Sequence, residues 1–186
     1  MTKTESLASL VKEVQVSESL AYLTSSIKYS ELSDEVIDRT KYLALDYLGL
    51  AARGSIFSSS EPIHTLLRTI GGVGEGVVVG NKDLRPSYQY AALANGSASH
   101  SLELDDVINE ASLHPAVVIF PTVFAVGEKY GKTGQEIIEA SVAGYEVMGR
   151  LGKALHPSNV YARGFHPTAV VGAFGAVAAA SKLLNL

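Results

Sequence analysis

The chain has 186 residues and a formal net charge of −4, and 47% of its residues are hydrophobic while 18% are charged. This composition is typical of an ordered chain with a buried core, either one domain or one lobe of a larger protein. Because Lys and Arg do not cluster, we expect neither nucleic acid nor an anionic membrane surface as a partner. The sequence contains no cysteine, which excludes disulfides, zinc–thiolate sites, a thiol nucleophile and an iron–sulfur cluster ligated by this chain.

The first elements of the chain are predicted from helical spacing. The N-terminus, MTKTESLASLVKEVQ, has no continuous apolar segment of the kind that marks a secretory signal, so we expect a cytoplasmic protein. Residues 17–28 should form a short helix. In the next helix Ser33 is the predicted N-cap and Gly54 the predicted end. One buried face is expected from the spacing of Val36, Thr40, Leu43, Tyr47 and Leu50.

A glycine-rich stretch, GGVGEGVVVG, occupies residues 71–80. A phosphate-binding loop needs a strand before the glycines and a helix after them, whereas here the strand-like piece follows the glycines. We therefore predict a turn and a short β-strand near residues 76–80, as a minor β element in a helical protein.

Four further helices complete the prediction of an all-α fold, a large helical bundle. They are expected from Ser87 to about residue 103, from 115 to about 130, from 134 to about 155 and from 167 to 184. The last is too short and too rich in Ala and Gly to span a bilayer well, and it is apolar on all sides, so it should be buried in a bundle. Its cover would come from a partner subunit or from a continuation of the polypeptide, and we favour the continuation.

Residues 100–115, HSLELDDVINEASLHP, form an acidic segment between two uncharged ones. Its carboxylates are Glu103, Asp105, Asp106 and Glu110, and His100 and His114 flank them. If the preceding helix continues, Glu103, Asp106 and Glu110 share one face of it, and this face would be exposed to solvent. A metal site could use His100 with Glu103 and His114 with Glu110, but the chain offers one such cluster, so no metal site is predicted. The uncharged flanks favour a third interpretation, a catalytic cleft, because both neighbouring segments should be buried.

Two histidines precede prolines at the predicted starts of long uncharged helices, His114-Pro115 and His166-Pro167. Proline favours the first turn of a helix, so each histidine is expected at or beside an N-cap, where backbone N–H groups attract anions. An imidazole beside such an anion site is suited to proton abstraction next to a carboxylate. The alternative for either histidine is a capping role alone, and His64 and His156 are expected to be structural.

Three segments, ALANGSASHSLELDD, HPAVVIFPTVFAVGEKYGKTGQEIIEASVAGYEVMGRLG and RGFHPTAVVGAFGAVAAASKLL, resemble the MmgE/PrpD family in this order. The family includes 2-methylcitrate dehydratase, cis-aconitate decarboxylase and iminodisuccinate epimerase. The resemblance implies that residues 1–186 are the N-terminal part of the family's helical domain, and that the rest of this domain and a smaller lid domain lie outside the chain. It also implies a homodimer, and catalysis without metal or other cofactor.

The resemblance implies a lyase that removes a proton and water beside a carboxylate of a di- or tricarboxylic acid, as 2-methylcitrate dehydratase does. An epimerase or a decarboxylase of the same family is the alternative among enzymes, and a non-catalytic helical fragment or subunit is the alternative outside them. The family's active-site histidines map to His114 and His166, and its acidic motif maps to Glu103, Asp105 and Asp106.

Arg163 and His100 are predicted to contact the polycarboxylate substrate. Two departures from the family pattern bear on which substrate that is. Glu103 stands where the family usually has Asp, and one extra residue separates the acidic motif from His114. Both differences alter the size of the pocket. The sequence does not say which histidine is the base and which is the acid.

Overall fold

The computed structural model describes residues 15–186, and within them it contains eight α-helices. Their bounds are α1 (Val16–Ser26), α2 (Asp34–Gly54), α3 (Glu61–Ile70), α4 (Tyr88–His100), α5 (Ala116–Tyr130), α6 (Gly134–Leu155), α7 (Pro157–Ala162) and α8 (Pro167–Leu184). Short 3-10 turns are η2 (Tyr29–Glu31), η3 (Ser58–Ser60) and η4 (Asn109–Ala111). The predicted all-α fold is confirmed.

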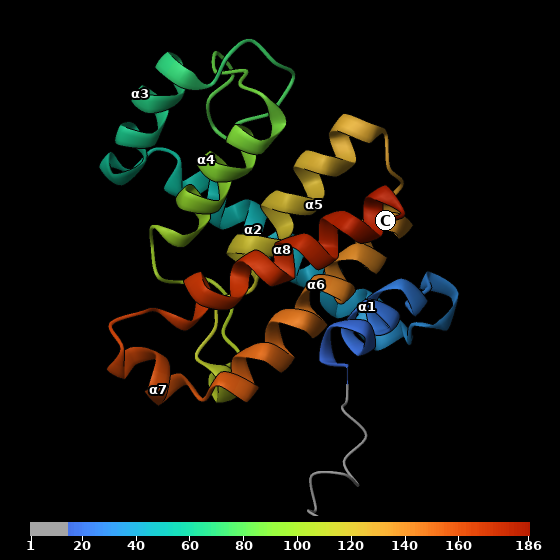
Figure 1. Cartoon of the computed structure of the whole chain (residues 1–186). Coiled ribbons are helices and arrows are strands. Elements are labelled where there is room, and N and C mark those ends of the chain that lie inside the picture. The colour runs from blue at the N-terminus through green and yellow to red at the C-terminus, as the bar shows by residue number, and fades with distance from the viewer. Residues whose placement is uncertain (1–14) are drawn as a thin grey trace, which may run out of the picture.

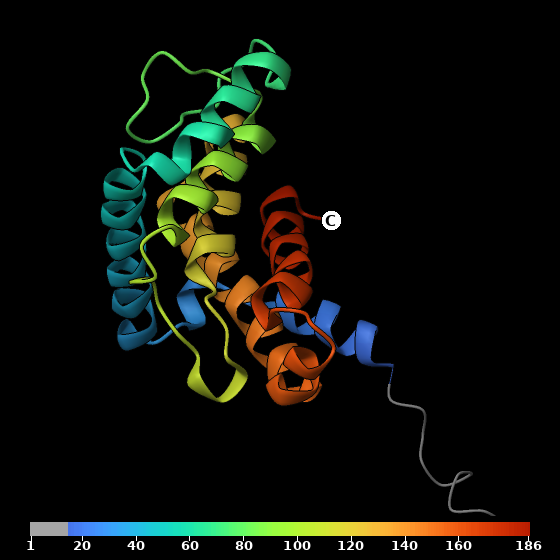
Figure 2. The same cartoon turned by 90° about the vertical axis from the view of Figure 1, so that its left-hand side faces the viewer.

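The helices are stacked in layers. Figure 2 shows α2 on one side and α8 on the other, with α4 and α5 between them. The main core lies where these layers meet α6, and its largest fully buried side chains include Tyr47, Phe120 and Met148. A smaller cluster around Leu67 and Val78 fastens α3 and the segment after it onto α4 (Figure 1).

The two longest helices begin at capping residues that are readable in the sequence. The hydroxyl of Ser33 accepts a hydrogen bond from the N–H of Val36 at 3.3 Å, as predicted. Thr133 and Glu136 form a reciprocal capping box at the start of α6. The predicted buried face of α2 is wrong at Val36, which is 38% exposed because it lines a shallow groove between α2 and α6, and Ile37 is buried instead.

The strand predicted near residues 76–80 does not form. The segment is extended, but its backbone pairs with a side chain in place of a second strand. Asn95 on α4 donates from Nδ2 to the carbonyl oxygen of Val77 at 2.8 Å, and its Oδ1 accepts from the N–H of Val79 at 2.8 Å. One amide group therefore satisfies the positions that a neighbouring strand would occupy.

The last helix, α8, is buried on one side only. Val171, Gly175 and Ala179 face the core, whereas Phe174 is 58% exposed and Val177 is 65% exposed. The outer face is thus exposed within the described residues, and its cover by a partner subunit or by a continuation of the polypeptide stays a prediction. The inner face approaches α6 closely, since a Cβ atom on Gly175 would lie 3.2 Å from the carbonyl oxygen of Gly144 on α6. By length and composition alone, α8 is the one helix of the described chain that could cross a membrane.

Candidate active site

Three helix ends meet at one end of the bundle and bring the predicted histidines together. His100 is the last residue of α4, His114 precedes Pro115 at the start of α5, and His166 is the N-cap of α8. The connecting segment 101–115 lies at the same end as α7 (Figures 1 and 2). The ring centroid of His114 is 5.1 Å from that of His100 and 6.1 Å from that of His166.

The acidic segment is a loop and not a continuation of α4. Helix α4 ends at His100, and Glu103 has the left-handed φ of 53°, which few residues other than glycine adopt. The loop then folds back through η4 and an isolated β-bridge between Ile108 and Leu113. The conditional expectation that three carboxylates share one helix face is therefore wrong, and each acid has its own surroundings.

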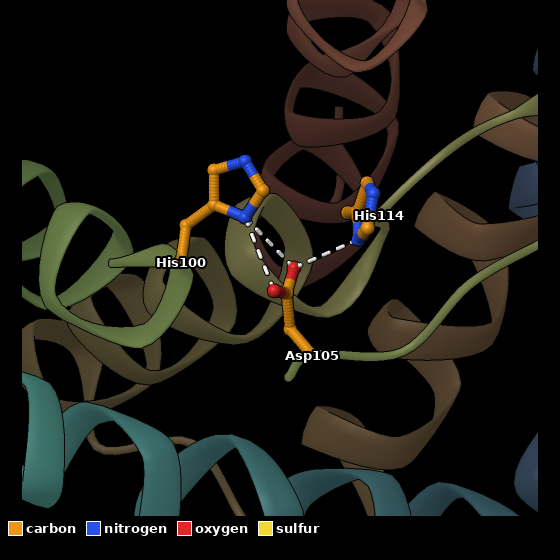
Figure 3. Close-up of side chains that lie close together, drawn as sticks. All are labelled: His100, Asp105 and His114. Atoms are coloured by element: carbon orange, nitrogen blue, oxygen red, sulfur yellow. Dashed lines mark hydrogen bonds and ion pairs between the residues drawn. The ribbon is translucent and has the colours of Figure 1, made fainter. Parts of the chain in front are cut away.

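Asp105 lies at the centre of the site, and its side chain is 1% exposed. Its carboxylate oxygens are 3.0 and 3.1 Å from Nδ1 of His100, and Oδ2 is 3.1 Å from Nδ1 of His114 (Figure 3). Burial raises the pKa of Asp105, but the hydrogen bond from His100 and the charges of both imidazoles outweigh this effect and hold that pKa below its usual value. The same hydrogen bond raises the pKa of His100.

The two catalytic candidates His114 and His166 are linked through Thr168. The N–H of His114 donates to Oγ1 of Thr168 at 3.0 Å, while the N–H of Thr168 donates to Nδ1 of His166 at 3.2 Å. Nδ1 of His114 is buried and has no aligned hydrogen-bond partner, and Asp105 is its polar neighbour. Sequence reasoning missed Thr168, although a threonine two residues after a histidine cap was the available signal.

Asp106 has a different position from Asp105. Its Oδ1 accepts a hydrogen bond from the N–H of Ala116 at 2.9 Å and so stabilises the start of α5, and its Oδ2 accepts from the hydroxyl of Tyr145 on α6 at 2.9 Å. Burial raises the pKa of Asp106 and that of Tyr145. Both oxygens of Asp106 are thus occupied by protein groups that hold the loop in place, and Tyr145 was not anticipated from the sequence.

A groove of about 640 Å³ runs between α4, α5 and α8 from this site. Most of its wall is apolar, and small residues such as Gly96, Gly172 and Ala173 leave it open. Its polar lining is supplied by Gln89, Ser97, His100, Thr122, His166 and Thr168. No Lys or Arg is among these lining residues.

The other predicted residues lie around or away from the cluster. The side chain of Glu103 is 75% exposed, and its Oε1 is 3.9 Å from Nε2 of His100. Glu110 is exposed on the loop, and Arg163 is exposed at the end of α7 and is not among the groove-lining residues. Neither of the histidine–carboxylate pairs that were considered for a metal forms a ligand set, whereas His100, Asp105 and His114 each offer one ligand atom, all within 4.8 Å of one another.

Comparison with known proteins supplies a family. The model of the MmgE/PrpD N-terminal domain matches residues 18–186. The cis-aconitate decarboxylase of Homo sapiens is 33% identical over 175 residues, which cover 92% of this chain and 36% of that protein. That of Aspergillus terreus is 33% identical over 177 residues, covering 92% and 36%.

A third relative is the cis-aconitate decarboxylase-like protein oryM of Aspergillus oryzae. It is 34% identical over 194 residues, covering 100% of this chain and 39% of that protein. The chain therefore spans little more than a third of the length of these relatives.

Proposed function

The chain belongs to the MmgE/PrpD family, and from this premise we propose that it forms part of a lyase that acts on a di- or tricarboxylic acid through His114 and His166. Members of the family such as the cis-aconitate decarboxylases are enzymes of the lyase type. Their names favour the loss of CO₂ from a substrate such as cis-aconitate. The dehydration of 2-methylcitrate, which the sequence motifs first suggested, is the alternative that the same site supports.

One observation carries the proposal: Nδ1 of His166 faces a backbone N–H, whereas Nδ1 of His114 faces a carboxylate. Nδ1 of His166 accepts a hydrogen bond from the N–H of Thr168, so a neutral His166 carries its proton on Nε2 and is a donor there. Nδ1 of His114 faces the carboxylate of Asp105 at 3.1 Å, which favours the proton on Nδ1 and leaves Nε2 free to accept. We therefore assign His114 as the base and His166 as the acid.

This pair suits the chemistry of polycarboxylate lyases. The loss of CO₂ breaks a carbon–carbon bond and leaves an electron pair on carbon, which needs a proton from an acid. The loss of water needs a base to take a proton from carbon and an acid to protonate the departing hydroxyl. In both reactions a proton moves to or from His114 or His166, and Asp105 is a positioning residue because it acts through His114.

The groove supports a substrate that carries carboxylates. Thr168 and Ala169, in the first turn of α8, are among its lining residues, and the N-terminus of an 18-residue helix attracts anions. We further propose that His100, which lines the groove, and Glu103, whose Oε1 is 3.9 Å from Nε2 of His100, contact a hydroxyl or carboxylate of the substrate. Arg163 would have to reach the groove from α7 to contribute.

The test is kinetic and uses the full-length protein. His114→Ala and His166→Ala should each lower turnover by about 10²–10⁴-fold with folding intact. The control is His156→Asn, because His156 is exposed, lies outside the cluster and has a φ of 53°, which asparagine tolerates. This variant should turn over substrate at the wild-type rate.

The two assigned roles can be separated by isotope exchange. With a substrate whose reacting carbon carries hydrogen, His166→Ala should still exchange that hydrogen with D₂O while losing product formation, and His114→Ala should lose both. Wild-type turnover in both alanine variants would overturn the assignment. A panel of cis-aconitate, 2-methylcitrate, citrate and iminodisuccinate identifies the reaction, and no turnover of any of them by the folded protein would favour a non-catalytic subunit.

A further inference from the structure

The cluster of His100, Asp105 and His114 is more than a pair of hydrogen bonds to one carboxylate. Two imidazoles and one carboxylate point toward one another, and the atoms with which they could bind a metal all lie within 4.8 Å of one another (Figure 3). Two come from the ends of different helices, α4 and α5, and the third comes from the loop between them. The arrangement therefore depends on the tertiary fold and not on a local sequence motif.

The spacing of these atoms is close to that of ligands on a zinc ion. Two ligands that stand about 2.0–2.1 Å from a tetrahedral zinc ion are roughly 3.3 Å apart. Nδ1 of His100 is 3.0 Å from Asp105, and Nδ1 of His114 is 3.1 Å from it. These two contacts need to open by a few tenths of an ångström to admit the ion, and the two imidazole nitrogens, which lie within 4.8 Å of each other, need to approach by up to about 1.5 Å.

A second observation also indicates a ligand. Nδ1 of His114 is fully buried and makes no aligned hydrogen bond, and a buried polar atom without a partner is rare in folded proteins. The side chain of Asp105 beside it is 1% exposed, and its ion-pair partners are the imidazoles of His100 and His114. A cation bound to both nitrogens and to the carboxylate would satisfy all three groups at once.

We propose that His100, Asp105 and His114 form a binding site for one divalent transition-metal ion of the zinc class. Two imidazole nitrogens and one carboxylate oxygen suit Zn²⁺ or Co²⁺, whereas Mg²⁺ and Ca²⁺ prefer sets made of oxygen alone. A fourth position is left for water or for a carboxylate from the groove. The side chain of His100 is 34% exposed, so an ion from solvent can reach the cluster at this residue.

Metal binding would change what the site can do. The ion takes the place of the proton on Nδ1 of His114, and the neutral imidazole then carries its proton on Nε2, where it can no longer accept one. Asp105 then holds the metal and no longer orients His114 as a base, so a bound ion switches that base off. This consequence rests on the proposed function, whereas the binding site itself does not.

The experiment measures metal binding without substrate. Titration calorimetry with Zn²⁺ should give one ion per chain, and Co²⁺ should give the visible absorption of a low-symmetry nitrogen and oxygen site. His100→Asn and Asp105→Asn should each weaken Zn²⁺ binding by on the order of tenfold or more. His156→Asn is the matched control and should bind as the wild type does, because His156 lies outside the cluster.

Three results would overturn the proposal. They are the absence of Zn²⁺ and Co²⁺ binding at micromolar concentrations, equal binding of Mg²⁺, or Zn²⁺ binding that is unchanged in both His100→Asn and Asp105→Asn. His100 is half-buried at the end of α4, so His100→Asn should fold, and the test stands even where Asp105→Asn does not fold. Because no substrate is present, the outcome is independent of which reaction the protein catalyses.

Discussion

Asp106 and Asp105 are neighbours in the chain with opposite surroundings, and the difference decides what each residue can contribute. Asp105 lies between two imidazoles, whereas Asp106 is tied to the N–H of Ala116 and to the hydroxyl of Tyr145. The second set of contacts joins the loop to α5 and α6. Asp106 therefore holds the loop in the position that Asp105 needs.

Removing the hydroxyl of Tyr145 tests this role. Tyr145→Phe leaves Oδ2 of Asp106 buried without its donor, so we expect the free energy of unfolding to fall by about 1–3 kcal/mol. Chemical denaturation measures the loss. The matched control is Tyr42→Phe, because Tyr42 is 69% exposed and removal of its hydroxyl should change the stability by less than about 0.5 kcal/mol. Equal stabilities of the two variants would contradict the role of Asp106 as the anchor of the loop.

The residues of the site show how far the sequence could lead. His114 and His166 were predictable because a histidine before a proline is a local helix-start signal, and both histidines lie at such starts. The link through Thr168 joins residues 54 positions apart, and the contact of Tyr145 with Asp106 spans 39 positions. Such contacts cannot be predicted from periodicity or spacing in the sequence, because they exist only once the helices have packed.

At the scale of elements, the helix ends that capping residues set are predictable from the sequence. The helix end that lies at the site is not. The start of α2 at Ser33 and the end of α5 at Gly131 follow from capping residues, and the structure agrees with them. The end of α4 at His100 follows from its packing against α2 and from the turn at Glu103, and the sequence alone extended this helix too far. The predicted strand failed for a similar reason, since Asn95 is 16 residues away from the N–H it accepts from.

The contact between α2 and α4 gives a prediction at this scale. A Cβ atom on Gly54 would lie 1.8 Å from the backbone oxygen of Ala98, which cannot move without shifting α4. Gly54→Ala should therefore lower the free energy of unfolding by about 1–3 kcal/mol. It should also lower turnover, because Ala98 is two residues from His100. Thermal denaturation and steady-state kinetics measure the two effects.

Gly49 in the same helix is the matched control. Nothing lies within 4 Å of a Cβ atom placed on it, and it is exposed. Gly49→Ala should leave stability unchanged or raise it by up to about 1 kcal/mol, because alanine is the better helix former. If Gly54→Ala were as stable as Gly49→Ala, the close crossing of α2 and α4 would be contradicted.

At the scale of the whole molecule, the candidate active site, at the ends of α4, α5 and α8, and the N-terminal helix α1 lie on different parts of the bundle (Figure 1). Helix α1 packs on α6 and α8 but buries no residue fully, so contacts at its end add to its attachment. Lys182 on α8 donates from Nζ to the carbonyl oxygen of Ser25 at 2.9 Å and to that of Ile27. The N–H of Tyr29 donates to the carboxylate of Glu139 on α6 at 2.6 Å. One lysine thus satisfies carbonyl groups that the end of α1 leaves free.

This attachment predicts that α1 can be loosened without disturbing the site. Lys182→Ala removes hydrogen bonds from a charged donor, each worth about 1.5–3 kcal/mol, so the amides of α1 should exchange with D₂O roughly tenfold faster or more. The amides of α4 and α5 should keep their protection, and turnover should be unchanged, because Lys182 touches no residue of the cluster. Hydrogen exchange read by mass spectrometry separates these segments.

Lys153→Ala on the exposed side of α6 is the control, and it should leave the exchange of α1 unaltered. Faster exchange in α5 as well as α1 would mean that α8 itself had shifted, which would contradict a local role for Lys182.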